Sequence, residues 1–590
     1  KARDFAKQEL SAAMGYATPI DISDEDMLYS VLTRPIPPKT EYAKQRPATP
    51  TELSTSSDDI SSDNESICAY KLRPVTPVLT ETSTSDVYSS DTDTELASER
   101  TPEADPAELE PAECAVAPRT WRQAIEPRLW SVATLVGIFA CAPLVVACWA
   151  VLVALGRTFG ERLAAIGGKR CDEVKPNGKV AIVSGGKMTK AYVIARQLKA
   201  QGCRVVLLET SKYWMVASRA SNCVDRFAMV PLPEKDLAGY LDAVRALAIE
   251  EKADLFIPVT SPAASEYEAQ VGPVLPAGCV SWSLDLETVR DLDDKTAFCS
   301  SAERLGLPAP RSHRVASDEE AHAFNEKLLA EAATATAGAE TRYILKSLAY
   351  DSMHRLDLFT LPCAPDVLDA YLAKLHTDGA AITQENPWII QTFVVGDEYS
   401  TCALVKEGRL LAFTDNRACL SCFNYTPARS EALRSWVRDF CAARRLSGVV
   451  CIDFIVDAQS GTPYAIECNP RFSSNVLNLL SNPAFGAALI RPDEVVDAVE
   501  PLAAQGETYF LFAEIWALLS KRPFSLRSAG ALLSTVATKK DAYFDVADPL
   551  PFIAHLFVHI PALLARNLST GNKWAKIDPC IGKLTEENGD

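Results

Sequence analysis

Residues 463–471 read PYAIECNPR, and residues 451–454 read CIDF. Both runs are rich in the apolar residues that favour buried strands, and each contains one carboxylate, Glu467 or Asp453. Because side chains alternate along a strand, Glu467 and Asn469 project from the same face, and Asp453 on a neighbouring strand completes a set of oxygen ligands. Carboxylate and amide oxygens suit Mg²⁺, or Mn²⁺ in its place, bound to nucleotide phosphates.

Three cationic side chains accompany these carboxylates. Lys346 ends the apolar run YILK, where an ammonium group is costly to bury unless it meets an anion such as phosphate. Lys295 begins a predicted helix, whose dipole also favours an anion. Arg471 follows Asn469, and its charge there would lie near a transferring phosphoryl group. A snorkelling Lys346 and a hydrogen-bonded strand carboxylate at Asp453 are the structural alternatives.

A nucleotide base is predicted to bind at residues 388–398, WIIQTFVVGDE. The apolar strand residues would sandwich an adenine ring, and Glu398, seven residues after Gln391, would reach the ribose. Other signatures are missing from the sequence: residues 186–188 read GKM, so the P-loop pattern fails, and neither HExxH nor GxSxG occurs. The chain has only six histidines, which makes general-base catalysis by histidine less expected.

The pattern outward from these strands predicts two fold classes in succession. Strands alternate with helices between residues 177 and 288, which favours a parallel α/β sheet with its ligand crevice at the carboxyl ends of the strands. From 289 to 485 the pattern predicts an α+β unit of antiparallel strands. The predicted strands are 180–183, 205–208, 255–259, 343–347, 388–394, 398–405, 410–415, 449–456 and 463–468, and the predicted helices are 188–201, 237–251, 295–305, 364–376 and 430–444.

The stretch 129–156 contains no charged residue and is bounded by Arg128 and Arg157. As one helix it would be roughly 40 Å long, more than a bilayer core needs, so it predicts either one tilted span or a hairpin that enters and leaves on one side. Basic residues at both ends favour the hairpin, with the catalytic part in the cytoplasm. A buried core helix is the alternative. We therefore expect membrane lipid as a partner, and residues 119–176 form the apolar segment and its linker.

The two ends of the chain have different textures. Residues 1–118 are acidic and rich in Ser, Thr and Pro, which predicts disorder, either as a phosphorylated segment or as a plain solvated tail. The last region, 486–590, is predicted to be helical at 509–519 and 552–568. The second of these is too short to span a membrane, so it either lies in the interface or packs on the core.

Composition excludes some classes of function. A net charge of −18 argues against nucleic-acid binding, which needs an excess of Lys and Arg on one surface. The 17 cysteines are scattered among apolar residues, as free thiols of a reducing compartment are. Cys419 and Cys422 have CxxC spacing without a second pair, so we interpret them as ordinary thiols.

The order of these residues resembles the ATP-grasp superfamily over residues 179–481: two lysines, an apolar Gln-to-Glu hinge, an Asp, then Glu-x-Asn-Pro-Arg. The resemblance implies a pre-ATP-grasp α/β domain followed by an ATP-grasp domain. It also implies that Lys295 and Lys346 bind ATP phosphates, that Gln391 and Val394 lie at the adenine, that Glu398 binds ribose, and that Asp453, Glu467 and Asn469 hold Mg²⁺. The usual glycine-rich loop is replaced by 349–355, which would close over the phosphates through Ser352 and Arg355.

Several longer motifs are similar to the mycosporine–glycine synthase family of ATP-grasp ligases. They include SGGKMTK at 184–190, ETSKYW at 209–214, LDDK at 292–295 and DPLPF at 548–552. The resemblance implies condensation of glycine with 4-deoxygadusol, a cyclohexenone, through a phosphorylated enol. The implied catalytic residues are Lys346 and Arg471, other enzymes of the same pathway are implied as partners, and the implied substrate residues are Ser184, Gly185, Gly186, Lys187, Thr210, Ser261 and Ser265.

Two other functions stay open from the sequence alone. One is a different ATP-grasp ligase that joins a carboxylate to an amine, as in dipeptide synthesis. The other is a membrane-tethered scaffold with a degenerate nucleotide fold. The retained carboxylates and lysines argue against the scaffold.

Overall fold

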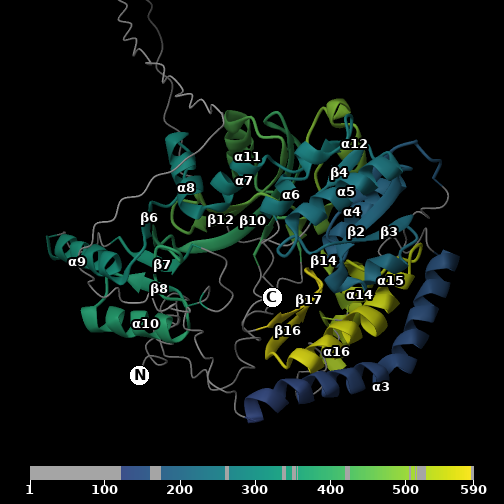
Figure 1. Ribbon diagram of the computed structural model, residues 1–590, viewed down its shortest axis with the longest axis horizontal. Helices are drawn as coiled ribbons and strands as arrows, with labels where there is room; N and C mark the ends of the chain where they lie inside the picture. Colours follow the sequence, from purple (N-terminus) through teal and green to yellow (C-terminus); the bar gives the residue numbers. More distant parts are fainter. Residues whose placement is uncertain are drawn as a thin grey trace, which may run out of the picture. The chain divides into compact units, whose positions relative to one another are not determined.

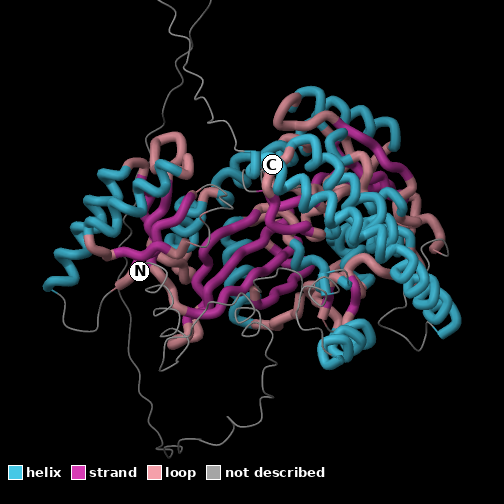
Figure 2. The backbone as a smooth tube through the Cα atoms, turned by 90° about the horizontal axis from the view of Figure 1, so that it is seen from below, coloured by secondary structure: helices cyan, strands magenta, loops and turns pink. Residues whose placement is uncertain are grey.

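The computed structural model describes residues 121–159, 174–259, 265–334, 341–348, 354, 357–418, 425–503, 507–511, 513–514 and 526–586. The acidic tail 1–118, the pair Cys419 and Cys422, and the predicted site residues Ser261, Ser352 and Arg355 lie outside these ranges. Figure 1 labels the helices and strands, and Figure 2 shows helices covering the strands in a second view.

The first sheet is parallel, as the sequence predicts, with strand order β3-β2-β1-β4-β5. Its central strand β1 alternates between two cores. Val183 packs with helix α4 (Thr189–Ala200), and Ile182 packs with helix α5 (Leu237–Glu251) on the opposite face. The strands are β1 (Val180–Val183), β2 (Arg204–Thr210), β3 (Arg226–Val230), β4 (Leu255–Ile257) and β5 (Val280–Ser281).

The second sheet is antiparallel, with strand order β11-β10-β12-β13. One face packs on helix α11 through Val437 and Phe440. The other face shares a core with α4 of the parallel sheet, where Cys451 joins Ile194. The elements are α7 (Leu286–Asp293), α8 (Lys295–Arg304), β10 (Gly396–Lys406), β11 (Arg409–Arg417), α11 (Glu431–Arg444), β12 (Gly448–Asp457), β13 (Pro463–Asn469), η6 (Ser474–Leu479) and α12 (Pro483–Ile490).

The third sheet is antiparallel too, with strand order β6-β9-β7-β8. Trp388 and Ile390 of its strand β9 pack against Leu372 of helix α10. The elements are β6 (Ser312–Val315), α9 (Asp318–Thr334), β7 (Tyr343–Ser347), β8 (Phe359–Leu361), α10 (Pro365–Thr377) and β9 (Trp388–Thr392). The parallel sheet followed by antiparallel sheets confirms the predicted fold classes and their order.

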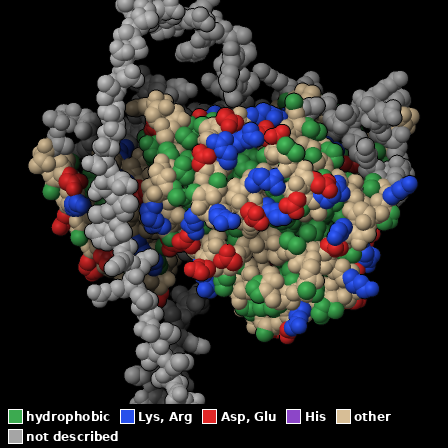
Figure 3. Space-filling view, turned by 90° about the horizontal axis from the view of Figure 1, so that it is seen from above, with side chains coloured by type: hydrophobic (Ala, Val, Ile, Leu, Met, Phe, Trp, Pro, Cys, Tyr) green, Lys and Arg blue, Asp and Glu red, His purple; other side chains and the backbone are tan. Residues whose placement is uncertain are grey.

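The apolar segment forms one continuous helix, α3 (Trp121–Phe159), with Pro127 and Pro143 inside it. The favoured hairpin is therefore wrong: a proline permits a bend, but the helix continues through Pro143 without a turn. By length and composition, residues Ile125–Ala154 could cross a membrane, and so could Leu550–Thr570. Elsewhere on the molecule, the face in Figure 3 carries Lys, Arg, Asp and Glu interspersed.

The C-terminal region contains short strands in addition to the helical stretch predicted at 552–568. Short strands β14 and β15 pair in parallel, and β16 and β17 form a hairpin. The sequence hides them because each is only a few residues long. The elements are β14 (Thr508–Tyr509), α14 (Leu526–Thr538), β15 (Lys540–Asp541), α15 (Leu550–Ala554), the π-helix η9 (His555–His559), α16 (Ile560–Thr570), β16 (Trp574–Asp578) and β17 (Lys583–Glu586).

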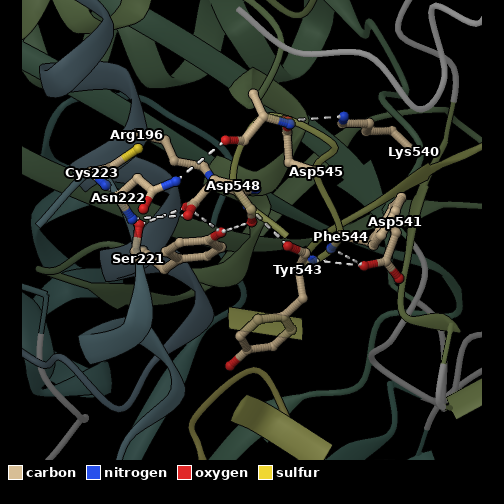
Figure 4. Close-up of polar contacts among 12 residues, drawn as sticks. Arg196, Ser221, Asn222, Cys223, Lys540, Asp541, Tyr543, Phe544, Asp545 and Asp548 are labelled. Carbon is tan, nitrogen blue, oxygen red and sulfur yellow. Dashed lines mark hydrogen bonds and ion pairs between the residues drawn. The ribbon is translucent and has the colours of Figure 1, made fainter. Parts of the chain in front are cut away.

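A buried carboxylate joins this region to the parallel α/β part (Figure 4). Asp548 Oδ2 accepts hydrogen bonds from Tyr192 Oη at 2.8 Å and Ser221 Oγ at 2.6 Å. Asp548 Oδ1 accepts from the backbone N–H of Asn222 at 2.9 Å, and Arg196 Nε lies 3.5 Å from Oδ2. Because hydrogen-bonded ion pairs are directional, this contact fixes how the segment docks on α4.

The remaining short elements are helix α6 and several 3-10 turns. They connect the larger elements near the edges of the sheets. Their bounds are α6 (Ser265–Ala269), η2 (Ser211–Tyr213), η3 (Ala217–Ala220), η5 (Gly272–Val274) and η7 (Pro492–Glu494).

Candidate active site

The two carboxylates that the sequence predicts as metal ligands lie opposite each other on neighbouring strands. Asp453 of β12 pairs with Glu467 of β13, and on its other side with Ser400 of β10. The register shifts directly after the Asp453–Glu467 pair, and such bulges re-aim side chains beside active sites. Asn469 Nδ2 donates a hydrogen bond to Asp453 Oδ2 at 3.1 Å. The structure thus brings all three predicted ligands together.

The pair has an uneven charge distribution. Burial and the negative charge of Glu467 raise the pKa of Asp453 well above its usual range. Burial alone would also raise the pKa of Glu467, but the charges of Lys295 and Lys346 outweigh it and lower that pKa. Two carboxylates this close resist ionising together, so a cation between them would relieve the repulsion. Their environment fits a divalent metal ion.

The chemistry of the ligand set favours magnesium. No group of three His, Cys, Asp or Glu residues within the described ranges is placed to hold a metal ion. The set at β12 and β13 is instead two carboxylates and the amide oxygen of Asn469. Mg²⁺ accepts one or two carboxylates and completes its octahedral shell with water and phosphate oxygens.

The predicted phosphate-binding lysines flank the carboxylates. Lys295 Nζ lies 3.5 Å from Glu467 Oε2 and donates to the carbonyl oxygen of Leu348 at 3.0 Å. It begins α8, whose preceding residue Asp294 caps the helix through its side chain. Burial lowers the pKa of Lys346, and the charge of Glu467 acts in the opposite direction. A metal ion on the carboxylates would leave both ammonium groups to meet phosphate oxygens.

Arg471 lies at the same edge of the sheet. Its Nη1 is 3.3 Å from Asp293 Oδ1, and its Nη2 donates to Asn469 Oδ1. Burial raises the pKa of Asp293, while the charge of Arg471 opposes that effect. The guanidinium is thereby held beside the ligand set, which is the position that phosphoryl transfer would require.

The residues predicted to contact the adenine and the ribose differ in exposure. Gln391 is buried, and its Nε2 donates to Ser312 Oγ at 3.0 Å and contacts Cys299 Sγ at 3.4 Å. Val394 is half-buried in the link between β9 and β10. Glu398 is exposed in β10, and its negative charge raises the pKa of both Lys346 and Asp453. The amide of Gln391 therefore bonds within the protein, whereas Glu398 faces solvent near the lysine.

The predicted substrate loop is bonded within the protein. Ser184 and its neighbours Gly185 and Gly186 are buried, and Ser184 Oγ donates to Glu268 Oε1 and accepts from the backbone N–H of Val259 at 2.8 Å. Lys187 is half-buried, and its Nζ lies 3.7 Å from the centre of the Tyr213 ring. The role of this loop in substrate binding stays a prediction.

The other predicted substrate residues that the structure describes are Thr210 and Ser265. Thr210 ends β2, and its backbone N–H and hydroxyl donate to Glu209 Oε1 at 2.8 and 3.1 Å. Ser265 is buried at the start of α6. The position of Thr210 at the carboxyl end of a parallel strand agrees with the expected crevice edge.

Three buried charged residues near this edge carry no role in the sequence analysis. Glu268 accepts from Ser184, Glu209 Oε2 accepts from the N–H of Lys187 at 2.7 Å, and Lys190 donates to the carbonyl oxygen of Phe472. Each lies in a different element, so only the fold brings them to one edge. Lys190 does belong to the quoted motif at 184–190, and its place at the start of a buried helix face was the available signal.

Residues 371–475 match the family model of the ATP-grasp domain. The chain is an ATP-grasp ligase. The matched part of this ligase contains the carboxylate pair, Asn469 and Arg471, whereas Lys295 and Lys346 precede it. ATP and Mg²⁺ are typical of ATP-grasp enzymes.

No curated protein matches the chain in sequence. Among solved structures, N5-carboxyaminoimidazole ribonucleotide synthetase with ADP is 15% identical, with a TM-score of 0.43 over 61% of this chain and 97% of that one. The Staphylococcus aureus N5-carboxyaminoimidazole synthetase with ADP is 14% identical (TM-score 0.42; 60% and 87% covered). The biotin carboxylase domain of Hydrogenobacter thermophilus 2-oxoglutarate carboxylase with MgADP is 15% identical (TM-score 0.40; 54% and 71% covered).

Proposed function

We propose that this ATP-grasp ligase joins the amine of glycine to 4-deoxygadusol and releases ADP and phosphate. The observation that carries the ligase chemistry is the oxygen set of Asp453, Glu467 and Asn469, flanked by Lys295 and Lys346. The choice of substrates rests on the sequence motifs at 184–190, 209–214, 292–295 and 548–552.

Each charged group has a defined role in this proposal. Asp453, Glu467 and Asn469 would hold Mg²⁺, which when bound neutralises charge on the phosphate oxygens. The two lysines orient the phosphates, since an ammonium group binds phosphate as a point charge. Arg471 stabilises the negative charge that develops on the transferring phosphoryl group.

The reaction balances in two steps. The enol oxygen of the ring attacks the γ-phosphorus of ATP and loses its proton to solvent, the bond from that phosphorus to the bridging oxygen breaks, and ADP leaves. The neutral amine of glycine then adds to the activated ring carbon, the carbon–oxygen bond to phosphate breaks, and the amine loses a proton to solvent. The products are a conjugated enaminone, ADP and phosphate. Activation is needed because phosphate is a far better leaving group than hydroxide.

The test is an assay for ADP release with Mg²⁺-ATP, 4-deoxygadusol and glycine, with ultraviolet detection of the product. We expect ADP only when both substrates are present. Glu467→Gln removes a ligand charge and is expected to lower turnover by about 100-fold or more. Glu303→Gln, an exposed position on α8, is the matched control and should keep wild-type activity.

The outcomes separate the parts of the proposal. Normal turnover by Glu467→Gln would overturn the metal assignment. ADP release only with other acid and amine pairs, such as those of a dipeptide ligase, would overturn the substrates and keep the ligase. No ADP with any pair would overturn the catalytic assignment of the site.

We also infer that the ligase associates with a membrane, with its catalytic part on the cytoplasmic side. The support is the uncharged stretch 129–156 within α3, with basic residues near both ends. Large apolar side chains along it are exposed, among them Leu129, Val136 and Leu144. Apolar surface of this extent is unusual for a face that meets water.

A further inference from the structure

Helix α3 has two distinct faces over the side chains that the structure describes from Ile125 to Ala154. One narrow stripe is in contact with the C-terminal region, with a spacing of three to four residues, as one side of a helix has. The side chains of the stripe that are buried or half-buried are Pro127, Arg128, Ser131, Thr134, Leu135, Ile138, Ala142, Val145, Trp149, Leu152 and Val153. The other described side chains from 129 to 154 are exposed, including Trp130, Phe139 and Val151.

Most polar groups of this stretch face the protein. Between Leu129 and Val153 the side chains that carry a hydroxyl or an indole N–H are those of Trp130, Ser131, Thr134 and Trp149, and Trp130 is the exposed one. Ser131 Oγ donates to Asn567 Oδ1 at 2.9 Å, and Trp149 Nε1 donates to the carbonyl oxygen of Pro549 at 3.1 Å. Thr134 donates to the carbonyl oxygen of Trp130 at 2.8 Å within the helix. Apart from the indole N–H of Trp130 and the weakly polar thiols of Cys141 and Cys148, the described side chains of the exposed face are therefore apolar, the reverse of a helix that faces water.

The stripe is held near both of its ends. Arg128 Nε donates to the carbonyl oxygen of Leu568 at 2.9 Å, and Trp149 bonds to Pro549. These anchors are 21 residues apart, roughly 31 Å along the helix. Their partners are the two ends of the segment α15–η9–α16, which α3 follows side by side in Figure 1.

That segment is in turn packed on the catalytic part. Ile560, Leu563 and Leu564 of α16 share a core with Tyr213 and Val216, which follow β2 of the parallel sheet. If α3 crossed a bilayer in this docked state, it would carry α16 and the polar residues around Tyr213 into hydrocarbon, where charged and unsatisfied polar groups are costly. Docking along its length is compatible only with a helix that lies parallel to the membrane surface.

We propose that α3 lies in the plane of a membrane, with its exposed face in the outer acyl region of one leaflet and its stripe against the enzyme. This inference rests on the proposed membrane association and adds its geometry: the ligase is monotopic, and both flanks of α3 stay on the same side. Interfacial helices bury their apolar face shallowly, and their second face is usually polar and meets water, whereas the second side of α3 is covered by the enzyme. Arg128 and Arg157 stand at the ends of the apolar stretch.

A lipid surface fits the exposed face better than a second copy of the chain. A partner helix packs along one stripe and leaves the rest of a helix surface uncovered. The exposed face of α3 extends around most of its circumference, and the protein already covers the remaining stripe. Protein interfaces also have a polar rim, whereas this face has no charged, hydroxyl or amide side chain at its described positions from Leu129 to Ala154. Only a solvent-like apolar phase covers such a surface.

The first test measures binding of the full chain to phosphatidylcholine–phosphatidylserine vesicles by flotation. Val136 and Leu144 are 63% and 69% exposed, so the double variant Val136→Glu/Leu144→Glu removes no packing. We expect it to lose at least 10-fold in vesicle binding while its melting temperature in detergent is unchanged. Val496→Glu, at a side chain that is 90% exposed away from α3, is the control and should bind normally. Undiminished binding by the double variant would overturn the proposal.

The second test separates the in-plane geometry from membrane association itself. The full chain is diluted from detergent onto preformed vesicles, and trypsin is added outside. We expect cleavage on both sides of α3, before Arg128 and after Arg157, in all bound protein. Protection of one side would keep membrane association and overturn the in-plane helix. A wild-type chain that does not bind vesicles and dimerises through α3 would overturn both membrane association and the in-plane helix. None of these results bears on ADP release, which is measured separately.

Discussion

Asp548→Asn tests whether one buried carboxylate holds the C-terminal region on the catalytic part (Figure 4). Asp548 is 2% exposed, and its two oxygens accept from Tyr192, Ser221 and the backbone of Asn222 while facing Arg196. The asparagine keeps one oxygen acceptor and the shape of the side chain. It removes the negative charge and turns the second oxygen into a donor beside the guanidinium of Arg196.

The expected loss follows from these contacts. Removal of one partner of a buried ion pair costs roughly 3–5 kcal/mol, because the other charge stays buried without compensation. Two features of the site reduce that cost. Arg196 Nη2 keeps its bonds to the carbonyl oxygens of Tyr543 at 3.0 Å and residue 548 at 3.2 Å. The hydroxyls of Tyr192 and Ser221 are able to rotate and accept from the new amide, which recovers roughly 1 kcal/mol. We therefore expect a decrease of about 2–4 kcal/mol in the free energy of unfolding.

The measurement is urea unfolding followed by tryptophan fluorescence, with limited proteolysis of the C-terminal region as a second readout. Asp497→Asn, an exposed position, is the matched control and should change the unfolding midpoint little. Asp548→Ala should be less stable than Asp548→Asn, because it also leaves the N–H of Asn222 without its acceptor. A loss below about 1 kcal/mol for Asp548→Asn, or equal effects of the buried and exposed variants, would refute the reasoning.

Two further predictions concern α4. Gly486→Ala would place a Cβ 2.4 Å from the carbonyl oxygen of Gln197. We therefore expect thermal unfolding to show a decrease of roughly 1–3 kcal/mol in the free energy of unfolding. Gly530→Ala, with open space around it, is the control and should be neutral or slightly stabilising. Burial lowers the pKa of Lys190 to about 8 from 10.5, so between these values the unfolded chain binds more protons. The stability of the wild type relative to Lys190→Met should therefore rise from pH 8 to 10.5; a flat difference in urea unfolding would contradict this.

Much of the catalytic framework could be predicted from the sequence. Residues 463–469 of the quoted run form β13, and Glu467 and Asp453 meet across two strands, because alternating apolar residues specify both the strand and its face. Helix α5 and strand β7 have the predicted bounds, since caps and apolar runs mark their ends. Local patterns of this kind carry enough information because neighbouring residues decide them.

The rest depends on contacts between distant residues. Strand β5 is two residues long and exists only because β4 lies beside it. The composition of α3 predicts a membrane helix, but it does not predict which side of the helix packs on the C-terminal region. That side is decided by partners more than 400 residues away, such as Asn567 and Leu568. The bond between Ser184 and Glu268 likewise joins the loop after β1 to helix α6, which lies far away in the sequence.

The segment 184–190, whose last two residues begin α4, connects these parts physically. Thr189 Oγ1 donates to the carbonyl oxygen of Pro579 at 2.7 Å, and Lys190 donates to the carbonyl oxygen of Phe472, which follows Arg471 directly. Pro579 belongs to the hairpin that follows α16, the helix on which α3 docks. A change in residues 184–190 therefore displaces Arg471 and the docking segment together. Substitution of Thr189 or Lys190 would then lower activity by displacing the guanidinium of Arg471. This loss is expected while Lys295 and Lys346 stay intact, even where no substrate touches residues 184–190.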